Sequence, residues 1–186
     1  RVVERVLNRP DVRVVSNPEF LREGSAVRDF LKPDRIVIGA DDREAAIKVS
    51  SLYIDIAAPV VFTDPATAET IKYAANAFLA AKLSFVNAIA AVCEGVGADI
   101  DDLVVGLGLD RRIGEGFLRP GPGWGGSCFP KDTRALLRIA EDAGYRFGLL
   151  EGVLAVNEQQ FDRVVEKVRT ALDGRIEGAV VAVWGL

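Results

Sequence analysis

A glycine-rich segment carries the most reactive side chain of the sequence. Residues 119–132 read RPGPGWGGSCFPKD and contain Cys128, followed by Lys131 and Asp132. Its glycines and prolines disfavour regular helix or strand and let backbone amides approach a ligand closely. A helical pattern follows, so the thiol lies just before a helix N-terminus and three residues from an ammonium, two conditions that favour a thiolate. We expect Cys128 to be a nucleophile, although a structural turn with an incidental cysteine stays open.

The second cysteine, Cys93, provides an internal comparison. It lies in an apolar helical pattern, where we expect it to act as a small buried hydrophobic residue. Two cysteines placed in this way make a poor disulfide framework and suit a reducing, cytoplasmic compartment. The sequence has no histidine, which excludes a Ser-His triad, a Cys-His pair and a His-ligated zinc. Proton transfer is left to Lys, Asp, Glu, Tyr or water, and we expect no metal site.

Polar side chains also lie on one stripe of an apolar helical pattern. Glu69, Lys72 and Asn76 are spaced by three and four residues in ETIKYAANAF, so they share a helix face. A Glu–Lys pair at this spacing usually lies on a solvent-exposed face of a helix. Burying an ammonium and an amide without partners is costly, however, so Lys72 and Asn76 either line a cavity or meet polar groups across an interface. We favour the cavity.

Two carboxylates follow a predicted strand. Glu19 and Glu23 lie in NPEFLREG, directly after a short apolar run. Ligands of open α/β sheets bind beyond the carboxyl ends of the strands, which places both glutamates where function is common. The alternative is a turn with solvated carboxylates.

The elements that must position these side chains begin in α/β order. The first eight residues read as the tail of a helix, and residues 42–57 have helical periodicity. Short apolar runs predict three strands, at Val12–Val15, Asp34–Gly39 and Pro59–Phe62. This alternation predicts the end of a Rossmann-like domain over residues 1–63.

The centre of the chain is predicted to be helical. Asp64 can cap a helix that begins at Pro65 and runs to Glu94, apolar on nearly every side and therefore buried against other helices or a second subunit. Shorter helices are expected at 101–107, 133–143 and 149–172. Residues 64–173 form a predicted central helical domain. The run AVVAVW at 179–184 predicts the first strand of a further α/β domain that begins at residue 174.

Composition limits the partners. The net charge is −4, with a pI near 5.0 and no block of like charges, so there is no electrostatic footprint for nucleic acid or for an anionic membrane. Apolar stretches are expected to be broken before the length of a bilayer span. The sequence contains no Met and opens at Arg1 in mid-pattern, from which we expect an incomplete enzyme.

Three blocks of the sequence together resemble one family. NPEFLREGSAVRDFLKPDRIVIG, ETIKYAANAFLAAKLSFVNAIAAV and FLRPGPGWGGSCFPKD are similar to signature blocks of the UDP-glucose/GDP-mannose dehydrogenase family, most closely its UDP-glucose branch. The resemblance implies NAD-dependent oxidation of UDP-glucose to UDP-glucuronate, a polysaccharide precursor, in two steps through a Cys128 thiohemiacetal and thioester. Independently of the resemblance, we expect a homodimer, or a higher homo-oligomer, through the apolar helix from Pro65 to Glu94.

The resemblance assigns roles to individual residues. Residues that match the catalytic set are Cys128, Lys72, Asn76, Asp132 and Glu19. Residues that match substrate contacts are Phe20, Leu21, Arg22, Glu23, Lys72, Asn76, Arg112, Phe117, Arg119, Gly121, Gly123, Trp124 and Gly125. Residues that match positions near NAD are Glu23, Cys128 and Lys131.

The sequence departs from the family at both ends. It lacks the glycine-rich motif that holds the NAD pyrophosphate, and only AVVAVWGL stands for the nucleotide-binding domain that follows. GDP-mannose and UDP-N-acetylmannosamine dehydrogenation are alternative activities. Two readings from other classes also stay open, namely a non-catalytic helical dimerisation module and a cysteine-dependent dehydrogenase of simpler aldehydes.

Overall fold

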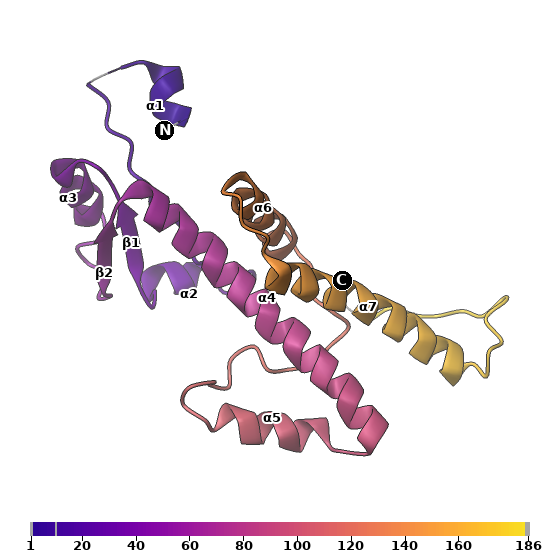
Figure 1. Cartoon of the computed structure of the whole chain (residues 1–186). Coiled ribbons are helices and arrows are strands. Elements are labelled where there is room, and N and C mark those ends of the chain that lie inside the picture. Colours follow the sequence, from indigo (N-terminus) through magenta and orange to yellow (C-terminus); the bar gives the residue numbers. More distant parts are fainter. Residues whose placement is uncertain (1, 10, 185–186) are drawn as a thin grey trace. The chain divides into compact units, whose positions relative to one another are not determined.

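A long helix, α4 (Pro65–Val96), runs through both compact units of the protein (Figure 1). The structure is a computed structural model that describes residues 2–9 and 11–184. One unit extends to Ala75 and the other begins at Asn76. The boundary between the units therefore falls inside the helix.

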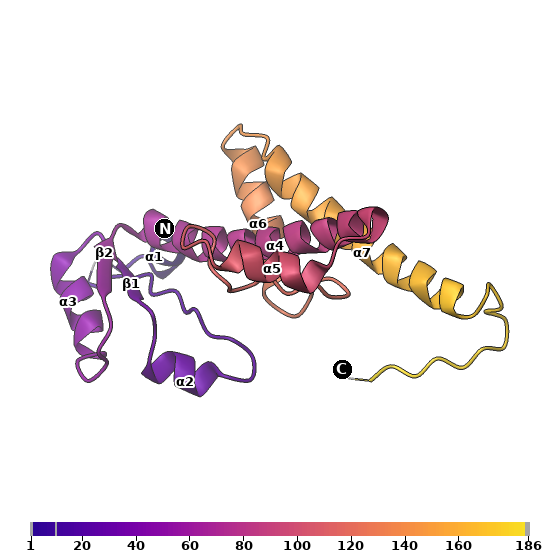
Figure 2. The same cartoon turned by 90° about the horizontal axis from the view of Figure 1, so that it is seen from below.

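The first unit contains a parallel strand pair. Strand β1 (Ile36–Gly39) pairs with β2 (Val60–Thr63), with Ile36 opposite Val60. Helix α3 (Arg43–Ser51) connects the strands and packs on β1 (Figures 1 and 2). Every residue of β1 is buried, as expected of a strand covered on both faces. This β–α–β order confirms the predicted end of a Rossmann-like domain.

Two short helices complete this unit. Helix α1 (Val2–Leu7) confirms the predicted helix over the first eight residues, of which residue 1 lies outside the described part. Helix α2 (Ala26–Leu31) was not predicted. It has only six residues, too few for a reliable helical periodicity, and none of them is buried.

Two predictions in this unit are wrong. Residues 12–15 form no strand, because only the next residue, Ser16, pairs with Gly39 in an isolated antiparallel bridge. Helix α3 ends at Ser51 and not near residue 57. Beyond it Leu52 and Ile54 are 78% and 81% exposed, so a longer helix would bury no further apolar face in this unit.

The start of α4 confirms the predicted cap. The carboxylate of Asp64 accepts a hydrogen bond from the Thr67 amide at 2.9 Å and another from its hydroxyl at 2.6 Å, while Pro65 takes the first helical position. The hydrogen bond from the Thr67 hydroxyl and, to a smaller extent, the one from the Thr67 amide lower the pKa of Asp64. The cap thus fixes the start of a helix of 32 residues.

The second unit adds three helices to its part of α4. They are α5 (Ile100–Gly108), α6 (Phe129–Asp142) and α7 (Gly148–Ala171). Helix α6 begins four residues before its predicted start, because Pro130 lies in the first turn, where an amide has no helical partner to lose. Residues 179–184 form no strand in the described chain, since no neighbouring strand supplies ladder hydrogen bonds; Val180 is 95% exposed.

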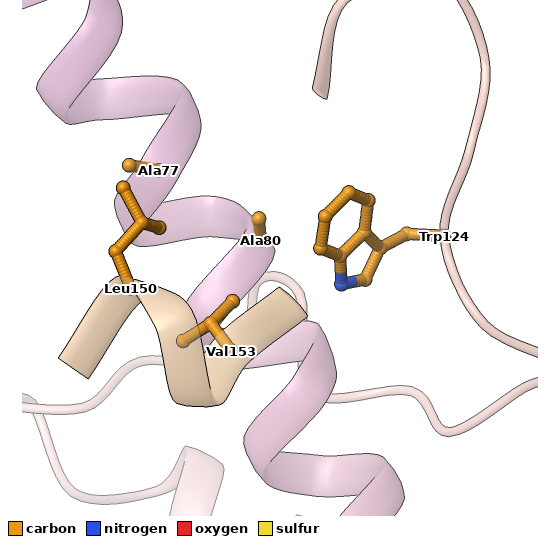
Figure 3. Packing of buried hydrophobic residues seen from close by; sticks show 5 residues of the cluster. All are labelled: Ala77, Ala80, Trp124, Leu150 and Val153. Carbon is orange, nitrogen blue, oxygen red and sulfur yellow. The ribbon is translucent and has the colours of Figure 1, made fainter. Parts of the chain in front are cut away.

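The core of the second unit lies between α4 and α7. Ala77 and Ala80 of α4 face Leu150 and Val153 of α7, and the indole of Trp124 points at them from the glycine-rich loop (Figure 3). Alanine side chains let the helix backbones approach closely and leave room for the indole ring. The loop is therefore part of the core and not an appendage to it.

By length and composition alone, helix α4 is apolar enough to span a membrane. The expectation that every apolar stretch is too short is therefore wrong, because a single charge such as Lys82 interrupts the apolar run without making the helix polar. The same helix buries Asn76, Ser84 and Asn87, each hydrogen-bonded within the protein. Buried polar groups with protein partners are typical of a core helix.

Gly39 tests the packing at the end of β1. A Cβ there would lie 2.5 Å from the Ala68 Cβ and 2.7 Å from the Asp64 carbonyl oxygen. We expect Gly39→Ala to lower the free energy of unfolding by about 1–3 kcal/mol, the cost of overpacking, measured by urea denaturation. The control is Gly152→Ala, at a helical glycine with nothing within 4 Å, which should stabilise by about 0.5–1 kcal/mol. Equal effects at both sites would contradict this account.

Candidate functional site

A buried carboxylate anchors the site in the second unit. The Asn76 side-chain amide donates to Asp132 Oδ2 at 2.6 Å, and the Lys131 ammonium contacts Asp132 Oδ1 at 2.6 Å. The Asp132 side chain is only 3% exposed, whereas that of Lys131 is 66% exposed. A buried carboxylate is tolerated when an opposite charge and a hydrogen bond compensate it. These three residues, from α4 and α6, form a charge-balanced cluster.

Cys128 occupies the N-cap position of α6, one turn before Asp132. Its backbone carbonyl accepts the Asp132 amide at 2.9 Å, and its half-buried thiol lies 3.6 Å from the Ser127 hydroxyl. The thiol makes no capping hydrogen bond. By contrast, Cys93 is 3% exposed inside α4, which confirms its predicted burial. The two thiols thus differ in accessibility, and only Cys128 lies beside the charged cluster.

Polar side chains that the sequence reasoning missed hold the glycine-rich loop. Asn87 of α4 accepts the Gly121 amide at 2.8 Å, and Gln160 of α7 donates to the Gly121 carbonyl at 2.6 Å. Asn157 of α7 binds both polar groups of the Trp124 backbone. The sequence does show these polar residues within largely apolar helices, which indicates that they need partners. It does not show that the partner is the glycine-rich loop.

The predicted polar stripe of α4 divides between two sets of partners. In the first unit, the Lys72 ammonium donates to the Glu19 carbonyl at 2.7 Å and to Glu19 Oε1 at 2.9 Å. Its side chain is 15% exposed. Four residues further along the helix, Asn76 meets Asp132 instead, while Glu69 is exposed. Lys72, which is half-buried, and Asn76, which is buried, therefore both have polar partners, and the favoured cavity is not required to explain them.

Phe20 lies between cationic groups of the first unit. The Arg35 guanidinium carbon is 3.9 Å from the centroid of the Phe20 ring, and the Lys72 nitrogen is 5.6 Å from it. Attraction of cations to the ring face holds this aromatic side chain beside Glu19. Leu21 is exposed, and its amide donates to Glu19 Oε2 at 2.7 Å. The segment after residue 18 is thus organised around the Glu19 carboxylate.

The next residues are closed into a loop by Asp29. Its carboxylate accepts the Arg22 guanidinium at 2.6 and 3.0 Å, the Arg22 amide at 3.0 Å and the Ser25 hydroxyl at 2.9 Å. The bonds from the Arg22 side chain, above all, hold the pKa of Asp29 far below its usual range. Arg22, a predicted substrate contact, is therefore engaged within the loop, and Glu23 is exposed on it.

The remaining predicted substrate residues lie in the segment that links α5 to the glycine-rich loop. Arg112 is paired with Asp110 through its guanidinium at 2.6 and 3.0 Å, which raises the pKa of Arg112. Phe117 has a φ of 62°, a strained conformation for an aromatic residue, and its ring lies 6.4 Å from that of Phe129. Arg119 is exposed.

The structure thus brings the predicted residues together in two groups, one in each unit. Asn76, Asp132 and Lys131 are in direct contact, with Cys128 one turn away. Lys72, Glu19 and Phe20 form the other group. The described residues contain no cluster of three or more His, Cys, Asp or Glu that could bind a metal. The chemistry on offer is that of a thiol with carboxylates, an amide and ammonium groups.

Family comparison covers both units. Residues 66–159 match the central domain of the UDP-glucose/GDP-mannose dehydrogenase family, and residues 2–57 match the NAD binding domain of the same family. The chain belongs to this family. The match confirms the family that the three sequence blocks indicated, and its first domain agrees with NAD as the predicted cofactor.

Several named relatives are UDP-glucose dehydrogenases. The chain is 53% identical to UDP-glucose 6-dehydrogenase TuaD of Bacillus subtilis over 93% of its length, and 50% identical to a UDP-glucose 6-dehydrogenase of Rhizobium meliloti over 100%. A UDP-glucose dehydrogenase structure from Pyrobaculum islandicum superposes with a TM-score of 0.84 at 45% identity, covering 87% of this chain and 37% of that one. The chain spans 37% and 44% of the two sequence relatives.

The hydrogen-bonded carboxylate of Asp29 predicts how the stability of the first unit depends on pH. A carboxylate whose folded-state pKa lies below its unfolded value of about 3.9 contributes stability that is complete above that value and is lost as the pH falls through the folded-state pKa. We expect Asp29→Asn to lower the free energy of unfolding at neutral pH, with a difference from wild type that shrinks below about pH 4, measured by urea denaturation across pH.

The control for this prediction is Asp55→Asn, at an exposed aspartate of the same unit. It should leave the acid limb of the stability curve unchanged. A difference between Asp29→Asn and wild type that stayed constant from neutral to acidic pH would show that the carboxylate charge does not act as described.

Proposed function

We propose that the chain carries the central catalytic part of an NAD-dependent UDP-glucose 6-dehydrogenase, which oxidises C6 of the sugar from alcohol to carboxylate. The observation that carries this proposal is Cys128 at the start of α6, one turn from the buried Asp132 cluster. A half-buried thiol beside compensated charges is a suitable nucleophile for an aldehyde.

The proposed reaction consists of two oxidations. In the first, the C6 hydroxyl loses a proton to a base and C6 loses a hydride, which gives an aldehyde. In the second, the Cys128 thiolate adds to C6 of the aldehyde, and the oxygen takes up a proton to form a thiohemiacetal. Loss of this hydroxyl proton to a base and of a second hydride from C6 then gives a thioester. Water adds to the thioester carbonyl as it gives a proton to a base, the C–S bond breaks, and the carboxylate, the Cys128 thiolate and a second proton are released.

Asp132 and Asn76 are proposed to manage protons and the oxyanion. Adding a thiolate to an aldehyde places negative charge on the former carbonyl oxygen, which needs hydrogen-bond donors. The Asn76 amide has a second N–H beyond the one given to Asp132, and that group can serve such an oxygen. Asp132 is an acceptor held in place by Lys131 and Asn76, which suits a group that orients a water molecule.

In the same reaction, Lys72 is proposed to stabilise the negatively charged oxygen, and Glu19 is proposed to activate the water molecule. The Lys72 ammonium is held by two acceptors of one residue, Glu19, and a fixed cation stabilises an alkoxide without reorganisation. Glu19 is 55% exposed and can therefore exchange a proton with solvent. We assign it as the base that activates water in thioester hydrolysis.

NAD is the proposed cofactor. Strand β1 and helix α3 lie within the segment that matches the family's NAD binding domain, and the exposed Lys131 ammonium suits an anionic cofactor. The residues proposed to contact it are Glu23 in the first unit and Cys128 and Lys131 in the second. When bound, NAD accepts the hydride that C6 loses in each oxidation.

UDP-glucose is the preferred substrate because the named relatives are UDP-glucose dehydrogenases. The diphosphate is proposed to bind backbone amides of Gly123 and of Gly125–Ser127, since amides in a glycine-rich loop bind anions and the Trp124 amide is already given to Asn157. The proposed contacts of the sugar and nucleotide are Phe20, Leu21, Arg22, Glu23, Arg112, Phe117, Arg119, Gly121, Trp124 and Gly125. GDP-mannose and UDP-N-acetylmannosamine are the competing substrates.

Cysteine variants test the proposal. With this chain in place of the matching segment of a full-length relative, we expect Cys128→Ser to lower NADH formation from UDP-glucose by roughly 10³-fold or more, because an alcohol is not ionised as a thiol is. Cys93→Ser, at a buried cysteine of α4, is the matched control and should retain activity. The measurement is NADH absorbance, accompanied by iodoacetamide labelling of each cysteine with and without UDP-glucose.

The labelling separates the alternatives. Preferential labelling of Cys128 that UDP-glucose slows supports the proposed site. Slowing by GDP-mannose alone would redirect the assignment to that sugar, and oxidation of simple aldehydes without a nucleotide would indicate the other class of dehydrogenase. Equal labelling of both cysteines with no ligand effect would leave the non-catalytic helical module as the better description.

We further propose that the second unit forms a homodimer through α4. Phe78, Phe85, Val92 and Val96 lie on one stripe of the helix, spaced by seven, seven and four residues, and are 54–71% exposed. Large apolar side chains aligned on one face are typical of an interface between subunits. A second copy of the chain presents the same stripe, so a two-fold arrangement would bury both.

A charge in this stripe tests the dimer. We expect Phe85→Glu to convert the dimer to a monomer at micromolar concentration, because pairing would bury an uncompensated charge, measured by sedimentation velocity. Leu149→Glu is the control, at a residue of α7 that is 72% exposed outside the stripe. A wild-type chain that is monomeric at this concentration, or a variant as dimeric as wild type, would overturn the proposal.

A further inference from the structure

The backbone N–H and C=O of one residue in the glycine-rich loop, Trp124, are both bound by a single buried side chain. Asn157 Oδ1 accepts the Trp124 amide at 2.7 Å, and Asn157 Nδ2 donates to the Trp124 carbonyl at 2.9 Å. Asn157 is 6% exposed, and so is Trp124. A primary amide is the neutral side-chain group that offers a donor and an acceptor side by side, which matches the two groups of this residue.

The residue before Trp124 is shaped for this contact. Gly123 has a φ of 116°, a conformation that L side chains rarely adopt. A Cβ at Gly123 would lie 2.8 Å from Phe161 Cε1 and 3.1 Å from Asn157 Oδ1. The backbone therefore passes against α7 so closely that glycine is required, and this approach brings the Trp124 backbone within reach of Asn157.

The Trp124 side chain carries the constraint towards Cys128. Its indole N–H donates to the Ser84 hydroxyl at 2.9 Å, which donates to the Val153 carbonyl at 2.8 Å. The indole ring points at α4 and α7 (Figure 3) and meets the Phe129 ring edge-on at 6.1 Å. Phe129 is the first residue of α6 and follows Cys128 directly. The loop and the start of α6 are thus fixed by one connected set of contacts.

We propose that Asn157 is a positioning residue for the nucleophile: by clamping the Trp124 backbone it fixes the glycine-rich loop and, through the Trp124–Phe129 contact, the place of Cys128 relative to Asp132. This rests on the proposed function for the role of Cys128 but not for the clamp itself. Asn157 lies 29 residues from Cys128 in the sequence and on another helix.

Tryptophan fluorescence tests the clamp without any assay of turnover. The sequence has two tryptophans, and Trp184 is fully exposed, so a Trp184→Phe background reports on Trp124 alone. In this background we expect Asn157→Ala to increase quenching of Trp124 by acrylamide. Val86→Ala is the control, at a fully buried residue of α4 that is outside the cluster containing Trp124. It should lower the urea midpoint of unfolding while Trp124 remains protected.

The isosteric Asn157→Asp variant supplies a readout that a purely structural role would not move. A protonated carboxyl can accept the Trp124 amide and donate to its carbonyl, whereas a carboxylate opposes that carbonyl with a second acceptor. Burial raises the pKa of such a carboxyl. Trp124 should therefore be protected at about pH 5 and quenched at about pH 8, whereas wild type, with an amide that does not titrate, should show no such change.

Turnover then links the clamp to the nucleophile. We expect Asn157→Ala to lower kcat by roughly 10²-fold, the effect of a small misplacement of a reacting group, and Val86→Ala to retain kcat where both are folded. Unchanged quenching in both Asn157 variants would overturn the clamp. Altered quenching with wild-type kcat would overturn its positioning role. Full activity of Cys128→Ser would instead refute the proposed function while leaving the quenching result valid.

Discussion

Polar side chains buried on an apolar helix are the constraint on which the second unit depends. Asn76, Ser84 and Asn87 of α4 are each less than 9% exposed, and a buried amide or hydroxyl without a partner costs a few kcal/mol (about 1–3). Each is satisfied by a group from a distant part of the sequence, namely Asp132, Trp124 and Gly121. The helix therefore selects one arrangement of the loop and of α6 over the other compact packings that its apolar surface would allow.

The glycine-rich loop is an irregular segment made rigid by this constraint. Its backbone is bound at Gly121 and Trp124 by side chains of α4 and α7, and its indole is part of the core. Glycine-rich loops are often mobile, because glycine has the largest conformational entropy to lose on folding. Here several specific hydrogen bonds and one aromatic side chain offset that entropy. A nucleophile held on such a loop can be reproducibly placed and still stand near solvent.

Charge compensation explains how a chain without histidine presents acid and base groups. Lys131 and Asn76 satisfy Asp132, and Glu19 satisfies Lys72. Both pairs combine a nearly buried partner with an exposed one: Asp132 with Lys131, and Lys72 with Glu19. The buried group is held in place and the exposed one can exchange protons with water. Pairs of this kind provide fixed charges at lower desolvation cost than a fully buried ion pair.

The sequence by itself determined the elements whose signals are local, as well as the family. The Asp64 cap, the length of α4, the burial of Cys93 and the position of Cys128 at a helix start all follow from spacing and residue type. Tertiary structure decided what depends on distant partners. Residues 12–15 and 179–184 are apolar enough for strands but form none in the described chain, because a strand needs a neighbour. Likewise, nothing local marks Asn157 as the partner of Trp124, since such a pairing exists only when two helices and a loop are packed together.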